Sequence, residues 1–242
     1  AGHCERLWRS IHDSGMWCRR PRDCSREDLV SRIAVVDLGT GNLHSVSKAL
    51  ERVAPGRVVE ITHDPAVIRA AGHVVLPGQG AIGSWFHALD KGHLREVVTD
   101  VLTARPILGI CLGLQALYAF SEEDGGTAGF GIMAGNVRRF PIRHEEKGQL
   151  LKVPHMGWNN VRQAVSHPLW RGIADDTRFY FVHSYYAHSA EPAEVAGTTA
   201  YGFSFISAAA RANIFAVQFH PEKSHRQGLT LLQNFVRWDG GV

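Results

Sequence analysis

One cysteine of this 242-residue chain has the surroundings of a catalytic nucleophile. Cys111 lies within residues 109–115, Gly-Ile-Cys-Leu-Gly-Leu-Gln, after an apolar run and before a helical pattern. A nucleophile on a sharp turn between a strand and a helix forms the geometry known as a nucleophile elbow. The helix N-terminus and a nearby imidazolium would favour the thiolate, and the backbone N–H of Leu112 would face an oxyanion formed on an attacked carbonyl. A buried, inert cysteine is the alternative interpretation.

A histidine and a glutamate far downstream could complete the catalytic group. His220 follows the apolar, β-rich run 213–219, and Glu222 stands two residues further on. Ligand sites of open α/β sheets lie at the carboxyl ends of strands, so we expect His220 and Cys111 at the same edge. The imidazole would act as the base and Glu222 would fix its tautomer. A solvated Glu222 carboxylate is the other possibility.

A glycine-rich loop is a third candidate. Residues 77–80, Pro-Gly-Gln-Gly, follow the strand predicted at 73–76. The glycines on both sides of Gln79 allow a backbone N–H to face a ligand or to flip towards it. Gln79 and Gly80 could therefore supply a second oxyanion donor. Taken alone, the loop fits an ordinary strand-to-helix turn better.

The elements that must position these residues alternate between strand and helix. This alternation is typical of an α/β fold with a doubly wound, mostly parallel sheet and helices on both faces. The predicted strands are 33–37, 58–61, 73–76, 106–110 and 213–219, and the predicted helices are 43–53, one from about 64, segments within 82–104, 112–120 and 225–238. After two glycines at 125–126 the pattern changes to short β-like runs, which predict a smaller antiparallel section. These runs are 136–140, 158–162, 178–183, 194–200 and 203–210.

The composition indicates a globular enzyme. Hydrophobic content of 45% and charged content of 20% are ordinary values. The net charge of +3 is small and no basic stripe is interleaved with aromatic residues, so nucleic-acid binding is not indicated. No apolar run is long enough to span a membrane, and no His/Cys cluster has zinc spacing. We expect no metal, no cofactor and a cytoplasmic location.

Residues 1–32 differ from the rest of the chain. They hold seven arginines, two tryptophans and three of the four cysteines, without a sustained apolar period. The segment lacks the apolar region of a secretory signal, and its five acidic residues argue against a transit peptide. We expect residues 1–32 to be a largely disordered or poorly packed extension and residues 33–242 to form one domain. Redox sensing through the three thiols is an alternative role for the extension.

Three motifs together resemble the class I, or triad-type, glutamine amidotransferases. They are residues 109–115, residues 77–80 and residues 220–222, His-Pro-Glu. The resemblance extends over about residues 33–242 and implies a Cys111/His220/Glu222 triad that hydrolyses the side-chain amide of glutamine.

Other stretches narrow the resemblance to the glutaminase subunits of imidazole glycerol phosphate synthase. They are residues 37–43, Asp-Leu-Gly-Thr-Gly-Asn-Leu, residues 154–159, Pro-His-Met-Gly-Trp-Asn, and residues 181–185, Phe-Val-His-Ser-Tyr. Two departures are Leu38, where the family usually has an aromatic residue, and Gln79, where valine is also common. Neither departure removes a catalytic group.

The resemblance also implies a substrate site and a partner. The residues expected to contact glutamine are Gly80, Gln115, His183, Ser184 and Tyr185. Ammonia must reach its acceptor by a water-poor route, and the family's partner is a (β/α)8-barrel cyclase subunit of the histidine pathway, which together with this chain would form a heterodimer. The residues expected to face that partner are Met156, Gly157, Trp158, Asn159 and Lys223. An ordinary core role for Met156 and Trp158, and a plain strand end for residues 183–185, are the structural alternatives.

Other functional hypotheses remain open at this point. The chain could be a triad glutaminase that serves pyridoxal phosphate or anthranilate synthesis. It could also be a non-catalytic binding subunit that has kept the fold, or a free-standing thiol hydrolase. The complete set of Cys111, His220 and Glu222 argues against the non-catalytic alternative.

Overall fold

A computed structural model describes residues 32–39, 42–141, 143, 145–146, 148–189 and 191–241. The prediction of a poorly packed extension therefore lies outside the described residues, with the exception of Arg32. Arg32 is the first residue of strand β1, where it pairs with Val58 and forms an ion pair with Glu60. The first strand thus begins one residue earlier than predicted.

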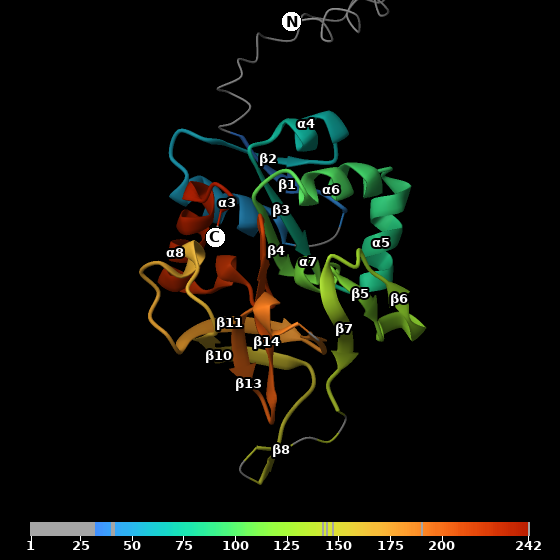
Figure 1. Cartoon of the computed structure of the whole chain (residues 1–242), viewed down its shortest axis with the longest axis vertical. Helices are drawn as coiled ribbons and strands as arrows, with labels where there is room; N and C mark the ends of the chain where they lie inside the picture. Colours follow the sequence, from blue (N-terminus) through green and yellow to red (C-terminus); the bar gives the residue numbers. More distant parts are fainter. Residues whose placement is uncertain are drawn as a thin grey trace, which may run out of the picture.

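Parallel strands form the centre of the molecule, in the order β2-β1-β3-β4-β15 (Figure 1). Their bounds are β1 (Arg32–Val36), β2 (Val58–Thr62), β3 (His73–Gly78), β4 (Ile107–Cys111) and β15 (Ile214–Val217). Every residue of β3, β4 and β15 is buried. This burial explains their continuous apolar runs, because a parallel sheet with helices on both faces has no solvated side.

Helices cover both faces of this sheet, as predicted. They are α3 (Leu43–Val53), α4 (Pro65–Ala70), α5 (Ile82–Lys91), α6 (Arg95–Leu102), α7 (Leu112–Gln115) and α8 (His225–Arg237). Successive residues of a strand point to opposite faces. Ile33 accordingly packs in the core beneath α3 and α8, whereas Ala34 packs in the core beneath α4, α5 and α6 (Figure 1). The predicted start of α4 is confirmed, because the Asp64 side chain accepts the N–H of Ala66 with Pro65 between them.

An antiparallel section extends the sheet beyond β15, which confirms the change of pattern after residue 126. Strand β14 pairs with β13 along one edge and with β15 and then β12 along the other, while β10 pairs with β11 and β13. The bounds are β5 (Tyr118–Ser121), β6 (Thr127–Ala128), β7 (Met133–Arg139), β8 (Glu145–Glu146), β9 (Gln149–Leu150), β10 (His155–Gln163), β11 (Thr177–His183), β12 (Tyr185–His188), β13 (Val195–Ala200) and β14 (Ser204–Arg211). Short 3-10 turns lie at Glu123–Gly125, Pro168–Trp170, Pro192–Glu194 and Pro221–Lys223.

The prediction of a helix over residues 112–120 is wrong in its second half. Helix α7 ends at Gln115, and strand β5 begins at Tyr118. The carbonyl of Leu117 accepts two N–H groups, from Ile132 and Met133, and therefore cannot continue a helical ladder. An apolar run of this length suits either structure, and pairing with a segment far along the chain decides it here.

The described residues contain neither a helix that could span a membrane nor a metal-binding cluster. No helix there combines the length and the apolar character required to cross a membrane. Nor do three or more His, Cys, Asp or Glu side chains come together there in a way that could hold a metal ion.

Candidate active site

The predicted elbow is present at the end of β4. Cys111 has φ 56° and ψ −103°, is 5% exposed, and immediately precedes the first residue of α7. The turn depends on Gly113, because a Cβ at that position would lie 1.9 Å from the carbonyl oxygen of Leu76 on β3. The turn therefore holds Cys111 in a backbone conformation that residues with a Cβ seldom adopt.

His220 and Glu222 lie at the neighbouring strand end. β15 runs parallel to β4 in the register Val217 to Ile110, and His220 follows three residues later. The Nδ1 atom of His220 lies 2.9 Å from Oε1 of Glu222, whose side chain is only 1% exposed. Glu222 is therefore not a solvated carboxylate.

The electrostatics of His220 result from opposing effects. Burial lowers the pKa of its imidazole, but the neighbouring Cys111 sulfur, together with the hydrogen bond and charge of Glu222, raises that pKa to about 10. Within the described part of the chain, Nε2 of His220 is buried and has no hydrogen-bond partner. The main chain of His220 is fixed as well, because its N–H donates to the Tyr180 carbonyl at 2.9 Å and its carbonyl accepts from Ser224 Oγ at 2.6 Å. The imidazolium is thus stabilised on both sides, by a sulfur and by a carboxylate.

The glycine-rich loop lies beside Cys111. Gly78 pairs with Cys111 in the β3–β4 register, and a Cβ on Gly78 would lie 2.7 Å from Cβ of Leu112. Gln79 and Gly80 follow as exposed residues, and Gly80 has φ +91°. A small cavity lies beside the loop and reaches His220 and Glu222. Its lining consists of Asn42, Val46, Pro77, Gly78, Gln79, Ile110, His220 and Glu222.

A buried amide network connects the predicted glutamine site to Cys111. Nε2 of Gln115 donates to the Tyr185 carbonyl at 3.1 Å and to Oε1 of Gln218 at 3.0 Å. Nε2 of Gln218 in turn lies 3.6 Å from the sulfur of Cys111. Gln218 was not among the residues predicted from the sequence, although an amide within the apolar run before His220 was a usable signal.

His183 and Ser184 complete the predicted glutamine set. Nδ1 of His183 donates to the Tyr185 carbonyl at 2.8 Å, and its Nε2 lies 2.9 Å from Nδ1 of His155. Burial, with repulsion from His155 and His220, lowers the pKa of His183 to about 3, so its ring is neutral. Ser184 is half-buried, and its carbonyl accepts the N–H of Phe140.

The predicted partner-facing residues lie around β10 and the turn after His220. Met156 is 65% exposed and Trp158 is 36% exposed, so neither is an ordinary core residue. The indole of Trp158 stacks on His225 at 4.9 Å with an interplanar angle of 8°. Lys223 places Nζ 5.9 Å from the ring centre of Tyr180.

The other two predicted partner-facing residues are partly buried. Gly157 lies between Met156 and Trp158 and pairs with Phe181 in the β10–β11 ladder. The amide of Asn159 turns inward, to Nε2 of His155 at 3.2 Å and to the carbonyl of Ala200 at 2.8 Å.

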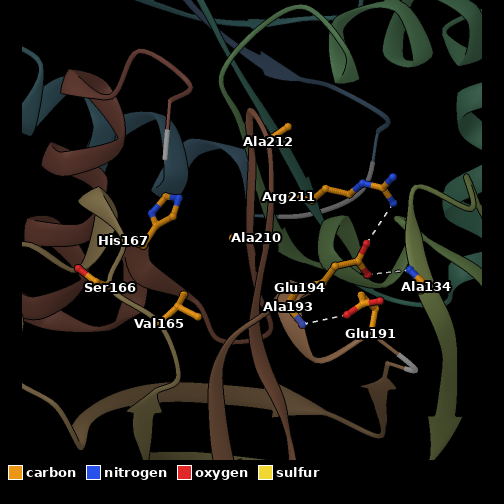
Figure 2. Close-up of a pocket in the computed structure, with 10 residues that line it drawn as sticks. All are labelled: Ala134, Val165, Ser166, His167, Glu191, Ala193, Glu194, Ala210, Arg211 and Ala212. Atoms are coloured by element: carbon orange, nitrogen blue, oxygen red, sulfur yellow. Dashed lines mark hydrogen bonds and ion pairs between the residues drawn. The ribbon is translucent and has the colours of Figure 1, made fainter.

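A larger cavity of about 510 Å³ is lined by none of Cys111, His220 and Glu222. Figure 2 shows that its charged side chains are already paired: Glu194 contacts Arg211 at 3.0 Å and accepts the N–H of Ala134 at 2.8 Å, and Glu191 accepts the N–H of Ala193. These pairs indicate that the polar groups of this cavity hold the surrounding strands together.

Comparisons with known proteins agree with this geometry. The family model for class-I glutamine amidotransferases matches residues 34–238. A protein of Nitrosospira multiformis named imidazole glycerol phosphate synthase subunit HisH is 59% identical over 208 residues, which are 85% of this chain and 97% of the relative. A protein of the same name from Thiobacillus denitrificans is 56% identical over 211 residues, covering 86% of this chain and 92% of the relative.

Solved structures show the same fold at low sequence identity. A crystal structure of a glutamine amidotransferase has a TM-score of 0.63 at 15% identity and covers 85% of this chain and 97% of its own. A glutamine amidotransferase from Thermotoga maritima has a TM-score of 0.56 at 17% identity, with 81% and 78% covered. The chain belongs to the class-I glutamine amidotransferase family, and within it to the group of imidazole glycerol phosphate synthase HisH subunits.

Proposed function

We propose that this chain is the glutaminase subunit of imidazole glycerol phosphate synthase. It hydrolyses glutamine to glutamate and ammonia, and passes the ammonia to a cyclase subunit that makes imidazole glycerol phosphate and aminoimidazole-carboxamide ribonucleotide in histidine biosynthesis. The observation that carries the proposal is the buried His220, which lies between Glu222 and the strained Cys111. The proposed location is the cytoplasm.

The chemistry assigned to the triad proceeds in two halves. The Cys111 thiolate attacks the amide carbon of glutamine, and a C–S bond forms as the C–N bond breaks. His220 transfers the proton on Nε2 to the departing nitrogen, which leaves as ammonia. The now neutral imidazole removes a proton from water, and the resulting hydroxide attacks the thioester and releases glutamate. Glu222 keeps the ring in the orientation that presents Nε2 to the sulfur.

Backbone N–H groups would stabilise the oxyanion in both halves. The N–H of Leu112 stands at the first turn of α7, immediately after the nucleophile. The peptides of Gln79 and Gly80 lie on the exposed loop next to Gly78, where a flip of the Gln79 peptide would aim a second donor at the same place. One such donor contributes a factor of about 10²–10³ to the rate. Partner binding that brings this donor into place would activate the enzyme by a factor of that size.

The cyclase would dock over Met156, Gly157, Trp158, Asn159 and Lys223. Exposed methionine and tryptophan are typical of the centre of a protein interface. Lys223 directly follows Glu222, so docking there would cover the mouth of the active site. Covering the mouth keeps ammonia away from bulk water, where it would be protonated and lost as a nucleophile.

Reconstitution with a cyclase subunit tests the proposal. We expect the two subunits to co-purify, and the glutamate released to match the imidazole glycerol phosphate formed from the cyclase's ribonucleotide substrate. A complex that releases no glutamate would support the non-catalytic alternative. Activation by the partner of pyridoxal phosphate or anthranilate synthesis, but not by the cyclase, would place the chain in another pathway.

The proposed catalytic unit is the domain that begins with β1. Arg32 belongs to it, because its ion pair with Glu60 joins β1 to β2. Deletion of residues 1–31 should therefore leave glutaminase activity and melting temperature close to those of the full chain. A fall of many degrees in melting temperature would contradict this boundary.

A further inference from the structure

We propose that Gln218 is a positioning residue for the nucleophile: its amide N–H orients the sulfur of Cys111 and stabilises the thiolate. The inference rests on the proposed glutaminase function. It adds a neutral hydrogen-bond donor to the two groups, His220 and the helix N-terminus, that the elbow geometry already supplies.

The direction of the Gln218 amide follows from a fixed end of the network. The carbonyl oxygen of Tyr185 can only accept, so the atom of Gln115 that lies 3.1 Å from it must be the NH₂ nitrogen. The second N–H of that nitrogen points to Gln218 at 3.0 Å, and the atom it meets must be an acceptor, Oε1. Nε2 of Gln218 is thereby turned to the other side, where the sulfur of Cys111 lies at 3.6 Å.

Both ends of this network are held rigidly. The Tyr185 carbonyl also accepts Nδ1 of His183 at 2.8 Å, so two donors fix it. Gln218 is fully buried, and its backbone N–H donates to the Ser207 carbonyl at 2.9 Å. A buried amide that is bonded at its oxygen and aimed at a sulfur has little freedom to turn, and such preorganised donors act without reorganisation during a reaction.

The chemistry of the contact favours the charged sulfur. A hydrogen bond to an ionised acceptor is stronger than one to a neutral acceptor, so an N–H aimed at the sulfur stabilises the thiolate more than the thiol. The same bond restricts the side-chain torsion of Cys111 and so aims the attacking lone pair. Loss of the donor should therefore slow every reaction of this sulfur, including reactions with reagents that do not resemble glutamine.

The substitution Gln218→Met tests this role, because methionine is unbranched and similar in length but has no N–H. The first readout is the rate at which iodoacetamide alkylates Cys111 in the full chain, followed by mass spectrometry of the peptide that contains it. The second readout is kcat and KM for glutamine in the complex with the cyclase. We expect alkylation and kcat to fall together by about ten- to hundredfold, the usual effect of a hydrogen bond to a charged group, while KM stays close to the wild-type value.

A purely structural role for Gln218 predicts that its substitution changes the alkylation rate in the opposite direction. If Gln218 only fills space, its replacement loosens the packing around a cysteine that is 5% exposed, and alkylation becomes faster. Alkylation at or above the wild-type rate would overturn the proposal whatever happens to kcat. The matched control is Ser207→Ala: this side chain is also fully buried, its Oγ has no hydrogen-bond partner among the described residues, and its removal should leave alkylation unchanged.

Two further variants keep the test decisive. If Gln218→Met does not fold, Gln218→Asn replaces it, because an amide that is one methylene shorter cannot span from Gln115 to the sulfur, and the same fall is expected. Gln218→His can still present a ring N–H to Cys111 and should recover part of the alkylation rate. Alkylation requires neither glutamine nor the cyclase, so a wild-type complex that made no glutamate would contradict the proposed function and leave the alkylation result readable.

Discussion

The backbone of Cys111 predicts that glycine gives a more stable protein than alanine at this position, whereas alanine is usually the more stabilising of the two. At φ 56° and ψ −103°, Cys111 occupies a region that favours glycine. A residue with a Cβ held in such a region costs about 1–3 kcal/mol. Cys111→Ala removes the thiol but keeps this strain, whereas Cys111→Gly removes both.

The expected difference in stability between the glycine and alanine variants is the relieved backbone strain minus the entropic cost of glycine. Glycine loses more backbone freedom on folding than alanine, which costs about 0.5–1 kcal/mol. Subtracting this cost from the relieved strain leaves the glycine variant ahead by about 1 kcal/mol. For a chain of this size, that gain corresponds to a melting temperature about 2–4 °C higher.

Denaturant unfolding and calorimetry of the two variants provide the measurement, and neither variant needs activity for the comparison. Ala216→Gly is the control, because Ala216 is a fully buried residue of β15 and should show the ordinary loss of stability. If Cys111→Ala proves more stable than Cys111→Gly by the same margin as at the control position, the strain at the elbow does not exist as described.

Three further perturbations test other parts of the structure. Gly113→Ala would place a Cβ 1.9 Å from the Leu76 carbonyl oxygen, and should destabilise the chain by about 3 kcal/mol in denaturant titrations, with loss of activity. Burial lowers the pKa of His73 from 6.5 to about 4. The stability that this neutral ring allows above pH 6.5 should therefore decline as the pH falls towards 4. His73→Gln should flatten that decline in unfolding curves measured across this pH range. Glu194→Gln removes a buried charge that Arg211 pairs with, and should cost about 1–3 kcal/mol of stability while kcat and KM in the complex stay unchanged; a changed KM would assign the larger cavity to the active site.

The strands that carry the proposed catalytic residues were predictable because burial on both faces requires continuous apolar runs. β3, β4 and β15 all have this pattern, and their carboxyl ends must share one edge of a parallel sheet. Placing Cys111 and His220 together therefore needed only local patterns and topology. Gly113 was predictable for the same reason, since a sharp turn against a neighbouring strand leaves no room for a side chain.

Features that depend on distant contacts were not predictable from local patterns. Residues 118–121 form β5 because β6 and β7 pair with them, although their apolar character suits a helix equally well. The position of Gln218 within an apolar run shows only that it is buried. Its contact with Cys111 emerges once Gln115 and the Tyr185 carbonyl, more than thirty residues away, are placed beside it.

In the proposed function, Cys111 generates ammonia for a partner that performs the ring closure. The most direct measurement compares the wild-type complex with a complex that contains Cys111→Ala, each supplied with either glutamine or an ammonium salt. We expect the variant to form no imidazole glycerol phosphate from glutamine but to match the wild type when ammonium is supplied at a pH where free ammonia is present. Glutamine-dependent product formation by the Cys111→Ala complex at the wild-type rate would show that Cys111 does not generate the ammonia.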